Sequence, residues 1–296
     1  MEAIRVEARR GDVVEATHSV HAVVVRGGTV LLTAGATKQV AFLRSSAKPF
    51  QALPLARARA NLDDELLAIA SASHRAEPAQ IAAVERLLAA APARADELEC
   101  GPQEGRPPDP LYHNCSGKHA GMLALARAKG WPTEGYRLPE HEVQRTILAV
   151  IAEAAEVDES EIPTATDGCG VPTHALPLER MARMFSRLES LPQGARIVAA
   201  MRRNPELVGG AGATDSELMR LRPGWAGKGG AEGLFCAAGP EATGLALKTE
   251  DGSNRAHRAA LAVLFAELGE PFEEFRATPI RNSRGEQVGE LVPAPS

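Results

Sequence analysis

Residues 44–50 read Arg44-Ser45-Ser46-Ala47-Lys48-Pro49-Phe50 and mark the point where strand patterning gives way to helical patterning. Before this segment, apolar runs at 23–25 and 30–32 flank a Gly-Gly centre, a pattern typical of a tight hairpin. A third strand is expected over 39–43. The segment therefore predicts a boundary between a strand-rich start and a helical middle.

Helical patterning fills the middle of the chain, and strands return towards its end. Apolar residues at helical spacing and small-residue runs predict helices over 81–88, 116–128, 143–154, 178–189 and 194–203. Strand patterning returns over 234–238 and 245–249, followed by a helix over 261–268 and a closing hairpin over 277–281 and 287–292. We therefore predict an α/β fold, with one antiparallel sheet built from both chain termini and a helical region inserted at about 50–215, in a single domain over 1–296.

Composition and charge restrict the classes of function. The net charge of -5 and the pI near 6.0 argue against a nucleic-acid or anionic-membrane partner, because both require a basic face. The first residues contain no apolar signal-peptide core, and no later run is long enough to span a bilayer. We expect a soluble, cytoplasmic protein.

Lysine is scarce, which makes each lysine a candidate for chemistry. Of the 33 basic residues only six are lysine: Lys38, Lys48, Lys118, Lys129, Lys228 and Lys248. A desolvated lysine can lose its proton, whereas arginine effectively cannot. A biased composition would give the same count, so the argument depends on the neighbours of each lysine.

Ser45 and Lys48 have the spacing of a nucleophile and its base. If Ser45 begins a helix, Lys48 lies one turn further on the same face, and a lysine with a lowered pKa can accept the serine proton. Pro49 is compatible with this arrangement only within the first helical turn. An ordinary N-cap serine beside a solvated lysine would produce the same pattern.

A second hydroxyl and lysine, Ser73 and Lys248, complete a candidate set. Ser73 follows a predicted helix, and Lys248 ends a predicted strand in the sequence Lys248-Thr249-Glu250. A strand-end lysine beside an SxxK helix is the general layout of serine penicillin-hydrolysing enzymes, although those have KTG where this chain has KTE. A turn serine with no chemical role is the alternative for Ser73.

Two further segments, Asn114–Met122 and Asp167–Thr173, each contain a cysteine. Cys115 and Cys169 could offer thiolates to a zinc ion, with a third ligand and water completing an open site. The widely spaced cysteines contain no CxxC pair, so buried thiols that pack as small apolar groups remain the alternative.

Taken together, six ordered segments resemble the rhizobial-type L-asparaginases, the asparaginase II family. They read RSSAKPFQ, ASH, NCSGKHAGML, DGCGVPT, GKGGAEG and LALKTEDG and extend over nearly the whole chain. The resemblance implies a fold similar to serine β-lactamases and penicillin-binding proteins, a homodimer, and release of ammonia from L-asparagine.

The resemblance also implies roles for individual residues. Two serine–lysine pairs would serve catalysis, Ser45 with Lys48 and Ser73 with Lys248. A zinc ion would be held by Cys115, Lys118 and Cys169. Residues near or touching the substrate would be Arg44, His119, Asp167, Gly229 and Gly230. In the expected mechanism Ser45 attacks the side-chain amide and Lys48 takes its proton, directly or through Ser73.

Two other functions remain open from the sequence. A penicillin-recognising serine hydrolase or peptidase would use the same fold, but KTE in place of KTG and the lack of an export signal count against it. A non-enzymatic zinc or thiol sensor is the second alternative, and the retention of the motif lysines in a lysine-poor chain argues against it.

Overall fold

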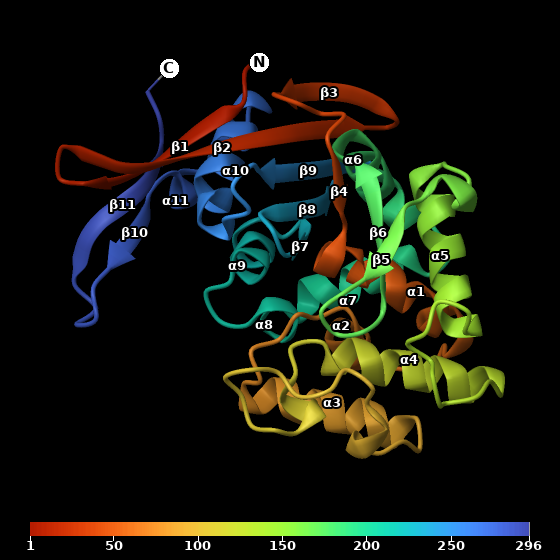
Figure 1. Ribbon diagram of the computed structural model, residues 1–296. Coiled ribbons are helices and arrows are strands. Elements are labelled where there is room, and N and C mark those ends of the chain that lie inside the picture. Colours follow the sequence, from red (N-terminus) through yellow and green to blue (C-terminus); the bar gives the residue numbers. More distant parts are fainter. Residues whose placement is uncertain (296) are drawn as a thin grey trace.

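The main sheet of the protein is built from both ends of the chain. The computed structural model describes residues 1–295. The strands of the main sheet are all antiparallel and follow the order β10-β11-β1-β2-β9-β8-β7, with β3 paired to β2. Their bounds are β1 (Ile4–Arg10), β2 (Val13–Arg26), β3 (Thr29–Ala34), β7 (Ala226–Gly229), β8 (Leu234–Gly239), β9 (Thr243–Thr249), β10 (Thr278–Arg281) and β11 (Gln287–Pro293). The predicted sheet from both termini is confirmed (Figure 1).

The predicted hairpins are also present. β2 and β3 pair from Arg26 opposite Thr29, so the Gly-Gly centre forms their turn. The expected third strand differs from the prediction. β4 (Val40–Phe42) does not join the main sheet but pairs with β6 (Pro172–Pro177), which also pairs with β5 (Thr164–Thr166) in a small separate sheet.

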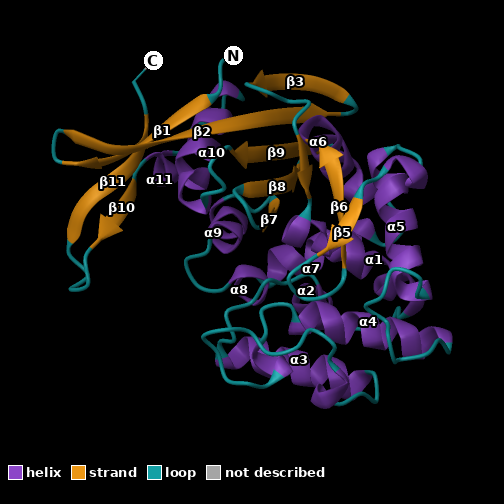
Figure 2. Cartoon of the chain, in the orientation of Figure 1, coloured by secondary structure: helices purple, strands orange, loops and turns teal. Residues whose placement is uncertain are grey.

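The helices that lie between the two halves of the sheet in the sequence pack mainly on one side of it, below the sheet in Figure 2. The inserted helices are α1 (Lys48–Ala58), α2 (Asp64–Ala70), α3 (Pro78–Ala90), α4 (Ser116–Lys129), α5 (Glu142–Ala155), α6 (Leu178–Arg187), α7 (Gly194–Arg203), α8 (Pro205–Gly209) and α9 (Thr214–Leu221). α10 (His257–Glu267) and α11 (Glu273–Arg276) follow the last central strand. Within residues 1–295, none of the helices has the length and apolar character needed to cross a bilayer.

Both faces of the central strands are covered, which explains their continuous apolar sequences. In β8, Phe235 and Ala237 pack into the core beside α10, whereas Leu234 and Cys236 belong to the larger core on the helical side. Successive side chains of a strand point to opposite faces, so a strand with two buried faces needs apolar residues throughout. β7 forms the end of the sheet nearest to the inserted helices, and the candidate site lies there.

Candidate active site

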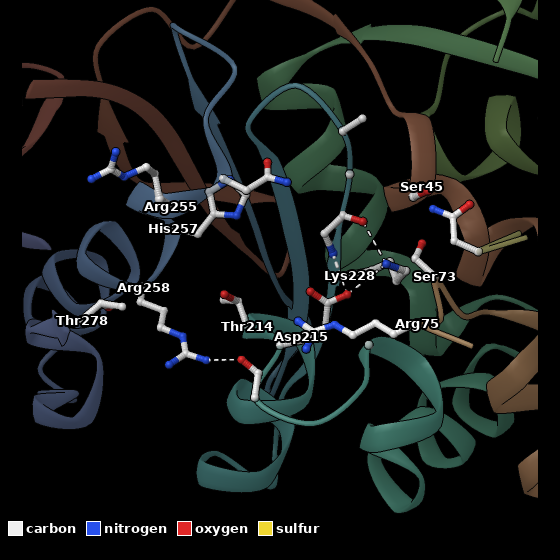
Figure 3. A pocket seen from close by; sticks show the side chains of 18 of the residues that line it. Ser45, Ser73, Arg75, Thr214, Asp215, Lys228, Arg255, His257, Arg258 and Thr278 are labelled. Atoms are coloured by element: carbon white, nitrogen blue, oxygen red, sulfur yellow. Dashed lines mark hydrogen bonds and ion pairs between the residues drawn. The ribbon is translucent and has the colours of Figure 1, made fainter. Parts of the chain in front are cut away.

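A cavity of about 600 Å³ opens where β7 meets the inserted helices. Its wall combines the turn before α1, the segments preceding α3 and α4, the loop from α8 to α9, and the start of α10 (Figure 3). Four residues predicted from the sequence line it: Ser45, Ser73, Gly229 and Gly230. Its volume lies within the range of small-molecule sites, which hold about 300–1,000 Å³.

Lys48 is buried next to this cavity and binds Ser73. Its Nζ donates a hydrogen bond to the Ser73 Oγ at 2.9 Å and another to the carbonyl oxygen of Ala72 at 2.6 Å. Burial, together with the neighbouring charges of Lys118 and Lys228, lowers the pKa of Lys48 to about 8. A lysine in this environment can act as a proton acceptor near neutral pH. The predicted serine–lysine chemistry therefore has a geometric basis, with Ser73 as the direct partner of Lys48.

The backbone holds Ser45 on the cavity wall in an unusual turn. A short 3-10 helix (Arg44–Ala47) precedes α1, so Pro49 falls in the first turn of α1, where proline is tolerated. Arg44 has φ 47, a conformation that non-glycine residues seldom adopt. Its Nε donates to Asp167 Oδ1 at 2.7 Å, and its N–H donates to Thr173 Oγ1 at 3.2 Å. These bonds fix the residue before Ser45.

A buried ion pair that the sequence did not reveal lies in the cavity wall. Lys228, 1% exposed on β7, donates from Nζ to Asp215 Oδ2 at 2.9 Å. Burial acts to raise the pKa of Asp215, but the charge and hydrogen bond of Lys228 outweigh it and hold that pKa below its usual value. Asp215 was assigned no role from the sequence, and Lys228 was noted only as one of the six lysines and as part of the segment GKGGAEG.

The predicted pair of Ser73 with Lys248 is not formed. Lys248 Nζ donates to the carbonyl oxygen of Thr249, and Lys248 does not line the cavity. Lys228 occupies the cavity instead because β7 is the edge strand beside the helices, whereas β9 lies two strands inside the sheet. Both lysines stand on strands, and the sequence does not reveal the order of those strands.

Gly230, which directly follows β7, allows the end of this strand to approach the Ser45 turn closely. A Cβ on Gly230 would lie 3.0 Å from Ser46 Oγ and 3.1 Å from the carbonyl oxygen of Leu43. Ser46 Oγ in turn donates to the carbonyl oxygen of Lys228 at 3.0 Å. The turn that carries Ser45 is therefore fixed against the end of β7, and Gly229 and Gly230 both face the cavity.

Three other predicted substrate contacts lie outside the cavity wall. His119 is fully buried, and its Nδ1 is 2.8 Å from the hydroxyl oxygen of Tyr136. Burial lowers its pKa well below the usual value, so the ring is neutral. Arg44 and Asp167 bind each other, and neither lines the cavity. Arg44 and Asp167 thus form an ion pair beside Ser45, and His119 lies in the core.

The predicted metal ligands converge behind Asn114, a residue of the cavity wall. Lys118 Nζ donates to Cys169 Sγ at 2.9 Å, and Cys115, Lys118 and Cys169 are each at most 5% exposed. Hydrogen bonding from Cys169, which outweighs burial, holds the pKa of Cys115 well below its usual value. Within residues 1–295, no three His, Cys, Asp or Glu side chains are grouped to hold a metal. The predicted set contains only two such residues, and a lysine is its third member.

Comparison with known proteins identifies a family. The sequence model of the L-asparaginase II family matches residues 6–293. Among solved structures, a β-lactamase from Mycobacterium bovis is 16% identical and has a TM-score of 0.39, with 86% of this chain and 94% of that chain covered. No curated protein sequence matches the chain. The family match covers nearly all of the sequence, and the protein belongs to the L-asparaginase II family.

Proposed function

We propose that the protein hydrolyses the side-chain amide of L-asparagine to L-aspartate and ammonia, with Ser45 as the nucleophile. The observation that carries this proposal is the 2.9 Å contact between Lys48 Nζ and Ser73 Oγ beside the cavity that Ser45 lines. Membership in an amide-hydrolysing family supports the reaction class. A buried lysine that can be neutral supplies the base that a serine nucleophile requires.

The proton of Ser45 moves through Ser73 in this mechanism. Ser45 Oγ forms a bond to the amide carbon and gives its proton to Ser73 Oγ, which passes its own proton to neutral Lys48. Protonated Lys48 returns the proton by the same route to the leaving nitrogen, the C–N bond breaks, and ammonia departs. Water then attacks the β-aspartyl ester with the same base, which releases aspartate and restores Ser45.

The end of β7 supports the transition state in this proposal. Gly229 and Gly230 bring the backbone of this segment against the Ser45 turn, but their own N–H groups already donate to Asp215 Oδ2 at 3.1 Å and to the carbonyl oxygen of Leu234 at 2.7 Å. The N–H group of Ala231, the next residue of the cavity wall, would stabilise a developing oxyanion. Lys228 places an ammonium group in the cavity wall, and the carboxylate of Asp215 balances its charge. Lys228 therefore replaces Lys248 as the second lysine of the site.

Cys115, Lys118 and Cys169 have the chemistry of a zinc site and would hold the ion. Two thiol sulfurs and one amine nitrogen gather in a buried space, and soft sulfur and nitrogen donors favour zinc. A bound zinc ion would supply Lewis-acid charge next to the cavity. The cluster is also connected to the catalytic lysine, because Asn114 directly precedes Cys115 and its carbonyl oxygen lies 3.4 Å from Lys48 Nζ.

Ammonia release from L-asparagine, with L-glutamine measured alongside, tests the proposal. Ser45→Ala and Lys48→Met are each expected to lower kcat by about 100-fold or more, because each removes a group that acts on the reacting atoms. The matched control is Ser253→Ala, a serine of the loop before α10 that does not line the cavity. Near-normal turnover in Ser45→Ala would contradict the assignment of the nucleophile.

A further inference from the structure

The cavity has a second end that the proposed reaction does not use. Figure 3 shows Ser45 and Ser73 at one end of the view and Arg258, His257 and Thr278 at the other. All five line the same cavity. Within residues 1–295, Asp215 is the only acidic residue of the lining, and it is already paired with Lys228. At the far end the described lining therefore contains cationic side chains and no carboxylate.

Two arginines, Arg75 on the side of Ser73 and Arg258 at the far end, are held by neighbouring carbonyl groups of one loop (Figure 3). Arg75 Nη1 donates to the carbonyl oxygen of Ala211 at 2.8 Å, and Arg258 Nη2 donates to that of Gly212 at 2.6 Å. Arg75 follows Ser73 by two residues, whereas Arg258 lies in the first turn of α10. The loop from α8 to α9 thus brings guanidinium groups from the helical region and from the C-terminal part of the chain towards each other.

Within residues 1–295 neither guanidinium forms an ion pair, although Glu77 Oε1 and Arg75 Cδ both lie beside Gly210. Glu217 is the acidic residue that acts on Arg258 through space, but its carboxylate is bound to Arg220 at 2.6 Å. Each guanidinium has five N–H donors, and carbonyl groups of the loop use only part of them. Two like charges held near each other favour an anion between them.

Buried polar atoms at the same end also lack partners. His257 is 2% exposed and lines the cavity, and its Nε2 has no hydrogen-bond partner. Thr278 Oγ1, also in the cavity wall, is buried without a partner. Unsatisfied buried polar atoms are uncommon in native proteins and are expected to find a partner. The Thr278 hydroxyl can donate to a ligand oxygen, whereas Nε2 of the neutral His257 ring, whose other nitrogen donates to the carbonyl oxygen of Gly233, can only accept from a ligand donor.

We propose that Arg75 and Arg258 bind a carboxylate of the substrate, so that the cavity selects amides that carry a carboxylate group. This inference rests on the proposed function and adds the part of the substrate that the serine does not touch. A planar guanidinium matches a carboxylate with two parallel hydrogen bonds. The α-carboxylate of free asparagine and the C-terminal carboxylate of a peptide share this chemistry.

Calorimetric binding of L-aspartate, the reaction product, gives a test that does not depend on turnover. Arg258→Met and Arg75→Met are each expected to weaken the Kd for L-aspartate by about 10- to 100-fold, because each removes charged hydrogen bonds. Arg180→Met is the matched control, since Arg180 on α6 is half-buried like Arg258, donates only to carbonyl oxygens and lies outside the cavity. Absence of L-aspartate binding to the wild type would overturn the inference, as would a change within twofold in both variants.

Kinetics of the same variants separate this inference from the proposed function. The KM for L-asparagine should rise about as much as the Kd for L-aspartate, with kcat within about threefold, because the arginines bind substrate away from the reacting amide. Unchanged KM in both variants, with an active wild type, overturns the carboxylate site and leaves the reaction standing. If the wild type is inactive but binds L-aspartate, and Arg258→Met loses this binding, the carboxylate site is supported and the proposed reaction is not.

Two additional arms identify the carboxylate and guard against misfolding. Ammonia release is measured with L-asparagine and with glycyl-L-asparagine. If Arg258→Met weakens release from L-asparagine alone, the site binds the carboxylate of a free amino acid. If it weakens release from both, the site also binds the C-terminal carboxylate of a peptide. If Arg258→Met does not fold, Arg258→Lys is measured in its place. It keeps the charge but loses the paired hydrogen bonds, so about a 3- to 10-fold weaker Kd is expected. A Kd equal to that of the wild type would contradict the inference.

Discussion

At the scale of single residues, the buried amine of Lys48 controls when the site can act. The pKa of Lys48 lies at about 8, lowered chiefly by burial, and only the neutral amine can accept a proton. The neutral fraction therefore grows as the pH rises through about 8. We expect kcat/KM for L-asparagine to increase about tenfold per pH unit below this value and to level off above it.

A pH–rate profile from pH 6 to 10 measures this dependence. Lys248→Met serves as the control, because Lys248 does not line the cavity and its ammonium binds the carbonyl oxygen of Thr249. The control should keep both the rate and the profile of the wild type. A profile that falls as the pH rises through 8 would be incompatible with Lys48 as the base.

The sequence identified Ser45, Lys48 and Ser73 but not how they pair. Spacing along a helix suggested that Lys48 meets Ser45, whereas the hydrogen bond of Lys48 is to Ser73, a residue 25 positions away. Such a contact depends on how the segment after α2 packs beside α1, which no local pattern encodes. Lys228 was missed for a similar reason, because its importance comes from its place on the edge strand.

At the scale of elements, the packing of α6 on the sheet depends on the absence of a side chain. A Cβ on Gly244 of β9 would lie 2.0 Å from the carbonyl oxygen of Ala182 and 2.3 Å from the backbone nitrogen of Ser186. Since both contacts are with backbone atoms of α6, the helix would have to move. Gly244→Ala should lower the free energy of unfolding by about 2–3 kcal/mol.

Urea unfolding of Gly244→Ala and of a matched glycine variant tests this expectation. Gly168→Ala is the control, because a Cβ there would meet no atom within 4 Å. Its free energy of unfolding should remain within about 0.5 kcal/mol of the wild type. Equal losses in both variants would show that the effect of Gly244→Ala is not caused by contact with α6.

Long amphipathic helices were predictable, whereas short elements and strand partners were not. The expected helix over 143–154 corresponds to α5 and that over 194–203 to α7, because each repeats apolar residues at helical spacing for several turns. The strand expected over 39–43 exists as β4, but its partner is β6 rather than the main sheet. Pairing between distant strands depends on tertiary packing, and β4 itself contributes only three residues.

At the scale of the whole molecule, the cluster of Cys115, Lys118 and Cys169 connects two distant parts of the chain. It joins the start of α4 to the turn before β6, and the zinc ligation proposed for it would add a cross-link between them. A ligand that binds only the folded state stabilises it by about 2.7 kcal/mol at a concentration 100 times its Kd. We therefore expect added zinc to raise the Tm of the metal-stripped protein.

Thermal unfolding with and without zinc measures this effect, and metal analysis gives the bound amount. Cys169→Ser should abolish both the rise in Tm and the bound zinc. Cys236→Ser is the matched control, because Cys236 is equally buried but lies on β8 with no predicted ligand role. A zinc-dependent Tm that survives in Cys169→Ser would show that the metal binds elsewhere.

The homodimer remains a prediction from the family resemblance.

The arrangement of the main sheet also determines when a newly made chain can become active. The ribosome produces β1 and β2 first, yet β2 pairs with β9, and β1 pairs with β11, near the end of the chain. At about 5–20 residues per second, these early strands wait for roughly tens of seconds with unpaired edges. Lys228 and Arg258 also emerge long after Ser45. During this time the open edges of the first hairpin are exposed to pairing with other chains, and a prematurely terminated chain contains neither a complete sheet nor a complete cavity.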